Sequence, residues 1–383
     1  MNPNVAVVGT GCVKFGERLD TSYEALATAA VDEALGDAGC AREQIEAAWV
    51  GTYLPGAHGG KSGTALADPL RLYGIPISRV ENYCATGTDA FRHAALAIQA
   101  GAYDVALVVG VEKMKDRPGR GLPLEGRHPI VGRGSSAPGQ FALAATRYMH
   151  ERKIGREVLA AVAVKNHENG AKNPLAHLQK AVTADAVLKA PMIAWPFGLY
   201  DCCPTTDGAA AAVLCRADRA REFSDKPVAV RGTGLAVTNG RPFLDPTFDY
   251  LGFPATAAAA AQAYTQAGIK DPARDIDFAE VHDCFTMTEI LNYEDLGFAV
   301  RGEGWRLIME GRTALGGDKP VNPSGGLKSF GHPIGASGVR MIYEVTRQIQ
   351  RRGEARQVAK SRIGLAHNVG GPGAVSCVVV LSE

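Results

Sequence analysis

The chain contains the same succession of segments twice, and this internal repeat constrains the fold more than any other feature of the sequence. Val5-Ala-Val-Val-Gly-Thr-Gly11 has a close copy in Val228-Ala-Val-Arg-Gly-Thr-Gly234. An alanine-rich helical pattern ending in Ala-Gly follows each copy, over residues 23–39 and 255–268, and a short strand-like run comes next. A chain of 383 residues is long enough for two such units.

Each half continues with a turn of small residues that opens a long helical pattern. The turn is Cys84-Ala-Thr-Gly87 in the first half and His332-Pro-Ile-Gly335 in the second, and the helices are predicted to end near residues 99 and 350. Cys84 and His332 therefore occupy equivalent positions in the two copies. A pseudo-twofold axis between the copies brings these helix starts together, so we expect a thiol and an imidazole in one cleft. Chance similarity between two glycine- and alanine-rich halves is the alternative.

Strands that alternate with helices indicate an α/β fold in which helices pack on a sheet. We assign residues 1–222 to an N-terminal half and residues 223–383 to a C-terminal half. Residues from about 115 to 202 fit neither copy and are rich in glycine, proline and basic residues, apart from a helical pattern over 141–152. They are predicted to form an inserted loop domain, a kind of region that often binds ligands. Residues 208–215 resemble a buried strand that returns to the first half.

Charge and cysteine content narrow the functional classes. Forty-one basic and forty acidic residues leave a net charge of +1, which gives no support to nucleic acid as a partner. Eight cysteines without a Cys-x-x-Cys pair indicate free thiols in a reducing cytoplasm. No signal peptide and no apolar run of bilayer length is recognised, so neither export nor a membrane is expected. The glycines after the first strand lack the third glycine of a dinucleotide loop, and the adjacent Cys202 and Cys203 lack metal-site spacing, so no metal is predicted.

Cys84 is the candidate nucleophile and His332 the candidate base. A thiol at a helix N-terminus is expected to have a lowered pKa, and the free backbone N–H groups there bind an oxyanion. A buried structural cysteine is the alternative for Cys84, and a histidine that caps a turn is the alternative for His332. The equivalence of the two positions favours a Cys–His pair.

Two further segments carry groups suited to acid–base chemistry. His282-Asp-Cys-Phe285 supplies an imidazole and a thiol, and Cys284 suits proton transfer to and from carbon. Asp283 is expected to cap the following helix, in which Glu289 and Glu294 are expected to be solvated. His367-Asn-Val-Gly-Gly-Pro-Gly373 forms a glycine-rich turn whose N–H groups polarise a carbonyl, unless it is only a tight turn between strands.

Seven segments in this order resemble the thiolase superfamily, and among its members the sterol-carrier-protein-type thiolases. The segments are Asn82-Tyr-Cys-Ala-Thr-Gly87, Lys165-Asn-His-Glu-Asn-Gly-Ala-Lys-Asn-Pro174, Cys203-Pro-Thr-Thr-Asp-Gly-Ala-Ala-Ala-Ala212, His282-Asp-Cys-Phe285, Asn322-Pro-Ser-Gly-Gly326, Gly331-His-Pro-Ile-Gly335 and His367-Asn-Val-Gly370. The resemblance implies the duplicated thiolase fold, in which two βαβαβαββ halves build a five-layer αβαβα core. It implies reversible cleavage of 3-ketoacyl-CoA, or Claisen condensation of acyl-CoA with acetyl-CoA, in lipid or fatty-acid metabolism.

The resemblance also implies roles for individual residues. Cys84 matches the nucleophile that becomes acylated, and His332 matches the histidine that activates it. His282 matches an oxyanion-hole residue and Cys284 the acid/base, while His367 falls where other thiolases place that cysteine. The backbone N–H groups of Cys84, Val369 and Gly370 are the expected oxyanion donors.

Ligand and partners follow from the same resemblance. Coenzyme A is the implied substrate or product, with no permanently bound cofactor, and the basic residues of the insertion are candidates for its phosphates. A homodimer or a dimer of dimers is implied, and a small OB-fold or zinc-ribbon protein is a possible partner subunit. Phe330 and Pro372 depart from the family pattern, which leaves the shape of the acyl pocket open.

Three other functions compete with this interpretation. A ketoacyl synthase usually carries His-Gly-Thr-Gly-Thr where this chain has His282-Asp-Cys-Phe285. A thiolase-like aldol lyase acting on steroid or branched acyl-CoA typically lacks the cysteine found here as Cys84. A non-catalytic subunit of an acyl-CoA channelling complex has no need of the intact set of thiols and imidazoles.

Overall fold

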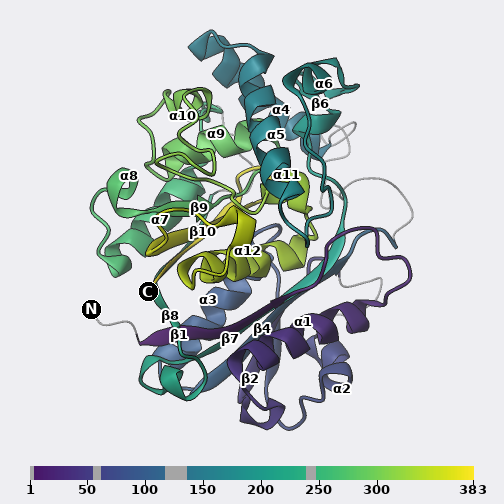
Figure 1. Ribbon diagram of the computed structural model, residues 1–383, viewed down its shortest axis with the longest axis vertical. Helices are drawn as coiled ribbons and strands as arrows, with labels where there is room; N and C mark the ends of the chain where they lie inside the picture. Colours follow the sequence, from purple (N-terminus) through teal and green to yellow (C-terminus); the bar gives the residue numbers. More distant parts are fainter. Residues whose placement is uncertain (1–3, 55–61, 117–135, 239–246) are drawn as a thin grey trace.

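One hydrogen-bonded sheet runs through both halves of the chain in the computed structural model, which describes residues 4–54, 62–116, 136–238 and 247–383 (Figure 1). Nine strands lie in the order β3-β2-β4-β7-β1-β8-β11-β10-β9. The two repeats meet where β1 pairs antiparallel with β8, through Ala6 opposite Ala229 and Val7 opposite Val228. The two segments that first revealed the repeat are therefore neighbouring strands at the centre of the sheet.

The N-terminal half follows the predicted βαβαβαββ order. Its elements are β1 (Val5–Cys12), α1 (Tyr23–Ala38), β2 (Ala47–Gly51), α2 (Ala67–Leu70), β3 (Ile77–Val80), α3 (Thr86–Gln99), β4 (Val105–Lys113) and β7 (Asp207–Arg216). β7 pairs antiparallel with both β1 and β4, which confirms the predicted return of the chain to the first half. α1 ends at Gly39, whose φ of 58° is a left-handed conformation that favours glycine.

The C-terminal half repeats this order with one strand almost lost. Its elements are β8 (Val228–Val237), α7 (Pro254–Ala267), α8 (Pro272–Asp275), β9 (Phe278–Glu280), α9 (Thr286–Asp295), α10 (Gly304–Met309), α11 (Gly326–Phe330), α12 (Ile334–Ile349), β10 (Ile363–Gly370) and β11 (Val375–Ser382). The third strand of the pattern is reduced to one bridge between Ala279 and Val321. Pro320 and Pro323 flank Val321 and lack the N–H groups that a longer ladder requires.

The strands of the two halves lie on either side of α3 and α12, and α1 and α7 cover their outer faces. Helices and strands therefore form five layers, as expected for the duplicated thiolase fold. α1 packs on β1 and β7 at one outer face, and α7 packs on β8 and β11 at the other. α3 and α12 lie side by side in the middle layer, between the strands of the two halves (Figure 1). This middle layer places the starts of both helices at the junction between the halves.

The inserted stretch is more regular than its glycine and proline content predicts. It contains α4 (Ala137–Arg152), α5 (Arg156–Ala171), α6 (Ala184–Lys189) and a hairpin of β5 (Met192–Ala194) and β6 (Phe197–Gly198). α5 packs against α9 and α11 of the C-terminal half. The remaining short segments are 3₁₀ turns, η1 (Arg42–Gln44), η2 (Gly63–Leu66), η3 (Leu199–Asp201), η4 (Ala217–Glu222) and η6 (Glu354–Arg356).

No helix in the described parts of the chain combines the length and the apolar character needed to cross a membrane.

Candidate active site

Glycines let the first turns of α3 and α12 approach closely. A Cβ atom on Gly338 would lie 2.2 Å from the backbone nitrogen of Thr88, and one on Gly87 would lie 2.6 Å from the carbonyl oxygen of Gly335. Such separations exclude any side chain, so the two backbones touch. The Glu112 carboxylate at the end of β4 also accepts a hydrogen bond of 2.9 Å from the Gly335 N–H, which fixes α12 to the N-terminal half. The residues just before the two helices are therefore held together.

Cys84 lies in a strained turn before α3. Tyr83 adopts a φ of 50°, a left-handed conformation that is uncommon for a residue with a side chain. The Thr86 hydroxyl stabilises this turn by donating to the carbonyl of Tyr83 at 2.5 Å and accepting from the N–H of Asn82 at 2.9 Å. The turn thereby fixes the direction of the Cys84 thiol, and the residue as a whole is half-buried.

Hydrogen bonds determine which nitrogen of His332 carries the proton. The Ser337 hydroxyl donates to the carbonyl of Pro333 at 2.9 Å, so its oxygen is left to accept from Nδ1 of His332 at 2.7 Å. Nδ1 is then the protonated nitrogen. Nε2 of His332 is buried and has no hydrogen-bond partner among the described residues. Its lone pair is free to accept a proton.

His282 has the opposite tautomer. The side-chain amide of Asn368 donates to Nδ1 of His282 at 3.2 Å, and its oxygen accepts from the Thr88 hydroxyl at 3.2 Å. Nδ1 of His282 is thus an acceptor, and the proton lies on Nε2, which is also buried and has no partner in the part of the chain that the structure describes. Two imidazoles therefore offer complementary groups, a lone pair on His332 and an N–H donor on His282.

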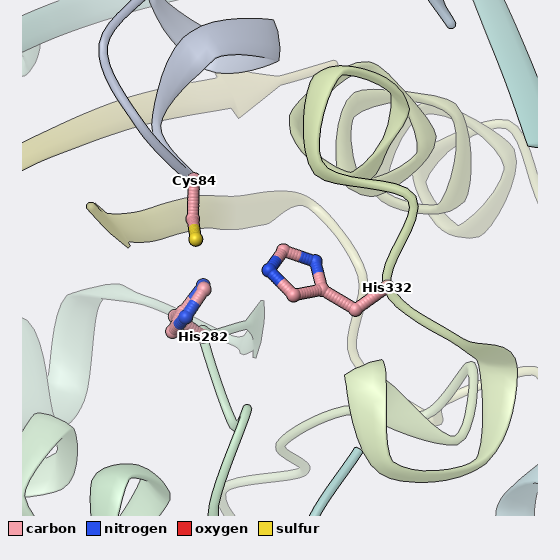
Figure 2. Close-up of side chains that lie close together, drawn as sticks. All are labelled: Cys84, His282 and His332. Carbon is pink, nitrogen blue, oxygen red and sulfur yellow. The ribbon is translucent and has the colours of Figure 1, made fainter. Parts of the chain in front are cut away.

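The side chains of Cys84, His282 and His332 lie together in the structure (Figure 2). The internal repeat predicted this proximity for Cys84 and His332. The sulfur and one nitrogen from each ring all lie within 4.8 Å of one another. The two rings meet edge to face, with centroids 5.2 Å apart and an interplanar angle of 83°. Figure 2 shows a ring nitrogen of His332 directed at the sulfur.

Burial keeps the members of this group neutral, contrary to the expected lowering of the Cys84 pKa. Loss of solvation raises the pKa of Cys84 to about 12, although the N–H groups of Gly371 and of Cys84 itself oppose the shift. Burial, aided by the positive charge of Arg340, lowers the pKa of His332 to about 3. The pKa of His282 is lowered by burial and by the neighbouring His332, His367 and Arg340. A neutral thiol beside a neutral imidazole requires proton transfer at the moment of attack.

Two backbone N–H groups act on the Cys84 sulfur, those of Cys84 itself and of Gly371. Val369 and Gly370, expected beside Cys84 as donors to an oxyanion, stay a prediction. Gly371 follows β10 and adopts a φ of 57°, a left-handed conformation that favours glycine. Gly370 instead packs its Cα against the cysteine turn, where a Cβ would lie 2.7 Å from the carbonyl oxygen of Asn82.

Cys284 lies at the start of the segment that leads into α9. Its thiol is buried and lies 3.9 Å from the hydroxyl of Thr288. Burial raises the pKa of Cys284, and the nearby thiols of Cys203 and Cys84 raise it further. Cys284 is therefore a protonated thiol close to Cys84.

His367 is not brought into the group. Its Nε2 lies 3.1 Å from the hydroxyls of Thr256 on α7 and Ser376 on β11, at the outer face of the C-terminal half. Successive side chains of a strand point to opposite faces, so Asn368 points to the inner face, toward His282. Sequence reasoning missed Asn368, and the alternation of faces along β10 was the signal that could have found it.

A buried polar network from the insertion holds the His282–Cys284 segment in place. The amide of Asn166 on α5 donates to Asp283 at 2.8 Å and to Glu289 at 2.6 Å. Glu289 also accepts from Asn322 at 2.8 Å and pairs with Lys165. Apart from Glu289, which was expected to be solvated, these residues were matched only as family motifs, and no local pattern indicates that they meet.

The expectations for Glu289, Glu294 and Asp283 were wrong. Glu289 and Glu294 are buried, and Glu294 accepts hydrogen bonds of 2.7 Å and 2.8 Å from the N–H groups of Gly302 and Gly304. Asp283 caps α11 rather than α9, since it accepts from the N–H of Leu327 at 2.6 Å. Phe330, one of the two departures from the family pattern, faces the core against Phe15, with ring centroids 4.8 Å apart.

Two of the basic residues proposed to bind the phosphates of coenzyme A form ion pairs with carboxylates of this chain. Lys113 is buried and pairs with Asp116 at 3.1 Å and Asp207 at 3.3 Å. Lys115 pairs with Glu17. The other basic residues of this part of the insertion, Arg117, Arg120, Arg127 and Arg133, lie outside the described residues.

The sulfur and two ring nitrogens are also ligand atoms of the kind that zinc prefers. The hydrogen bond from Asn368, however, leaves a proton on the His282 nitrogen that faces the group. The arrangement supplies one nucleophile, one proton acceptor and one proton donor, which suits covalent catalysis better than ligation.

Fold and site together define a duplicated α/β protein with a cysteine–histidine centre at the junction of its repeats. Residues 5–218 match the family described as thiolase, N-terminal domain, and residues 246–383 match the thiolase C-terminal domain-like family. The chain therefore belongs to the thiolase family, and thiolase-type acyl transfer is the activity that its relatives support.

Two relatives illustrate this membership. The chain is 40% identical to an acetyl-CoA acetyltransferase of Methanothermobacter thermautotrophicus, over 99% of this chain and 100% of the relative. It is 34% identical to sterol carrier protein 2 of Gallus gallus, over 98% of this chain and 71% of that protein.

Two solved structures share the fold. The Ltp2-ChsH2(DUF35) aldolase matches with a TM-score of 0.87 and 23% identity, over 100% of this chain and 98% of that chain. The Acat5 thiolase of Ascaris suum, solved in complex with coenzyme A, matches with a TM-score of 0.74 and 17% identity, over 99% and 100% of the two chains.

Proposed function

We propose that this protein transfers acyl groups between coenzyme A thioesters through an acyl group on Cys84, with cleavage or formation of a carbon–carbon bond. The observation that carries the proposal is the group of Cys84, His282 and His332, whose reactive atoms lie within 4.8 Å of one another. The name of the acetyl-CoA acetyltransferase relative supports acetyl-CoA as one of the substrates.

In the first step the free Nε2 of His332 takes the proton of the Cys84 thiol, and the thiolate attacks a carbonyl carbon of the substrate. Nδ1 keeps its proton because Ser337 accepts from it at 2.7 Å, so the imidazolium that forms stays hydrogen-bonded. The backbone N–H groups of Cys84 and of the turn after His367, with Val369 and Gly370 as the expected donors, bind the oxyanion of the tetrahedral intermediate.

In the cleavage direction the substrate is a 3-ketoacyl-CoA, and collapse of the intermediate breaks its carbon–carbon bond. The electron pair leaves as the enolate of acetyl-CoA, whose oxygen accepts a hydrogen bond from Nε2–H of His282. The Cys284 thiol protonates the carbon. Coenzyme A then attacks acyl-Cys84, its proton passes to the Cys284 thiolate, and His332 returns its proton to Cys84. Condensation is the reverse sequence, in which Cys284 deprotonates acetyl-CoA.

Retro-aldol cleavage is the alternative, supported by the fold shared with an aldolase. It requires no acyl group on a cysteine, whereas this chain has Cys84 within reach of an unprotonated imidazole nitrogen. Turnover of a 3-hydroxyacyl-CoA by the Cys84→Ala variant would favour the aldolase.

The decisive experiment is to mix the protein with acetyl-CoA and measure its intact mass and the masses of its peptides. We expect one acetyl group, on the tryptic peptide 80–92 that contains Cys84. Folded protein that remains unmodified under these conditions contradicts the proposal.

Two variants separate the steps. Cys84→Ala is expected to abolish acylation and turnover. Cys284→Ala is expected to retain acylation but to lose at least about a hundredfold in acetoacetyl-CoA cleavage, the contribution typical of a general acid–base. Cys40→Ala, at a buried thiol in the core beneath α1, is the matched control and should keep both activities.

Assembly forms part of the same proposal. β3 is an edge strand of the sheet in the described residues, and unpaired edges favour pairing with another chain. We propose a homodimer, and a small OB-fold or zinc-ribbon subunit as a possible partner, by analogy with the ChsH2(DUF35) component named in the aldolase structure. Sedimentation of the purified protein tests the dimer, and full activity of the protein alone argues against an obligatory partner subunit.

A further inference from the structure

A second cysteine lies directly opposite the proposed acid/base. Cys202 forms an antiparallel bridge with Phe285, which places the next residue, Cys203, opposite Cys284. The N–H of Cys203 donates to the carbonyl of Cys284 at 2.9 Å and fixes this register. The proposed catalytic steps make no use of Cys203.

This pairing has the main-chain geometry of a disulfide. Opposite residues of an antiparallel pair have Cα atoms about 4.5–5.5 Å apart and side chains on the same face. Disulfides usually span Cα separations of about 4.4–6.8 Å. Cys202 precedes Cys203 in the strand, so its side chain points to the opposite face, away from Cys284. The Cys202 thiol donates to the carbonyl of Gly198 at 3.6 Å. Cys203 and not Cys202 is therefore the partner that can reach Cys284.

Exposure distinguishes Cys203 from its partner. Cys203 is half-buried, whereas Cys284 is almost fully buried. The buried ammonium group of Lys328 donates to the carbonyl of Cys202 at 2.6 Å and thus lies beside Cys202 and Cys203. Burial raises the pKa of Cys203, and the positive charge of Lys328 opposes part of this shift. Of the two paired thiols, Cys203 is thus the one that a small oxidant reaches first.

We propose that Cys203 and Cys284 form a reversible disulfide when the protein meets a peroxide. The Cys203 thiolate attacks one peroxide oxygen, the O–O bond breaks, and a sulfenic acid and hydroxide result. The Cys284 thiol then attacks that sulfur, the S–O bond breaks, and a second hydroxide leaves. With the two thiol protons the products are one disulfide and two waters, and a dithiol reductant restores both thiols.

The consequence for activity rests on the proposed function, in which Cys284 moves the proton at carbon. A disulfide removes that thiol and leaves the group of Cys84, His282 and His332 in place. Oxidised protein is therefore expected to accept an acetyl group on Cys84 but to be unable to cleave acetoacetyl-CoA.

The experiment treats the full chain with hydrogen peroxide and analyses tryptic peptides without reduction. We expect peptide 190–216, which carries Cys203, to be linked to peptide 275–301, which carries Cys284. Acetoacetyl-CoA cleavage should fall by at least about a hundredfold and recover with dithiothreitol. Cys203→Ser should keep its basal activity and form no link, and Cys203→Ala should behave in the same way. Cys202→Ser is the matched control and should retain the link.

Other linkages overturn the inference. A link between peptide 80–92 and peptide 275–301 means that Cys84 is the partner, and a link that survives Cys203→Ser means that Cys202 or Cys215 is. Absence of any link in peroxide-treated protein also overturns it. A Cys203–Cys284 link without loss of cleavage supports the disulfide and counts against Cys284 as the acid/base, so the two proposals fail separately.

Discussion

Replacing Ser337 by alanine tests whether the tautomer of His332 matters. The Ser337 oxygen accepts the hydrogen bond from Nδ1 of His332 at 2.7 Å, and both residues are buried. Without this acceptor Nδ1–H has no partner, and the proton can instead occupy Nε2, the nitrogen that accepts the thiol proton in the proposed mechanism. An unsatisfied buried donor costs about 1–3 kcal/mol. At about 1.4 kcal/mol per factor of ten, Ser337→Ala should slow acylation of Cys84 by about fivefold to roughly 140-fold.

The assay is rapid-quench measurement of Cys84 acetylation by acetyl-CoA, with cleavage of acetoacetyl-CoA measured in parallel. Thr346→Val is the matched control, because Thr346 lies on the same helix α12 and its buried hydroxyl has no hydrogen-bond partner. This control should acylate at the normal rate. Thermal unfolding of both variants separates loss of the base from loss of the fold.

An unchanged acylation rate in folded Ser337→Ala would refute the assignment of Nε2 as the proton acceptor. A rate loss of the same size in Thr346→Val would refute the specific role of Ser337.

The remaining predictions concern packing and pH. Gly338→Ala should destabilise the protein by about 1–3 kcal/mol and slow acylation, because the new Cβ would lie 2.2 Å from the backbone nitrogen of Thr88. Gly36→Ala, in α1 with open space at the Cβ position, should be neutral or stabilising in the same denaturation assay. Burial lowers the pKa of His367 to about 3, so its native environment favours the neutral form and its contribution is lost as pH falls below about 6.5. The stability difference between wild type and His367→Asn should therefore shrink by about 1.4 kcal/mol per pH unit below that pH, and a constant difference would contradict it.

The approach of Cys84 and His332 could be predicted because it depends on two local patterns and one symmetry relation. Each residue lies at the equivalent position of its repeat, just before α3 or α12. The pseudo-twofold packing of these two helices brings the two residues together. The βαβ order and the glycine at the end of α1 are likewise local properties of the sequence. Features of this kind can be predicted from the sequence because residues close together along the chain determine them.

The rest depends on burial and on contacts that no local pattern records. The raised pKa of Cys84 follows from lost solvation, whereas sequence indicated only the helix N-terminus, whose effect is opposite. Asn166 meets Asp283 although 117 positions separate them along the chain. Glu289 was expected to be solvated because most charged residues on helices are, but Lys165, Asn166 and Asn322 bind it in the interior. His367 and Asn368 are consecutive residues of β10, so their side chains point to opposite faces of the strand. His367 therefore faces α7, and Asn368 faces His282.

The placement of thiol and imidazole on different repeats has a consequence for synthesis of the protein. During translation the first repeat leaves the ribosome with Cys84 but without His332, the base of the proposed mechanism. In that mechanism the growing chain lacks the group that deprotonates its thiol. The site is complete only when the second repeat docks and α12 packs against the glycines of the first repeat, so the proposed activity depends on completed folding.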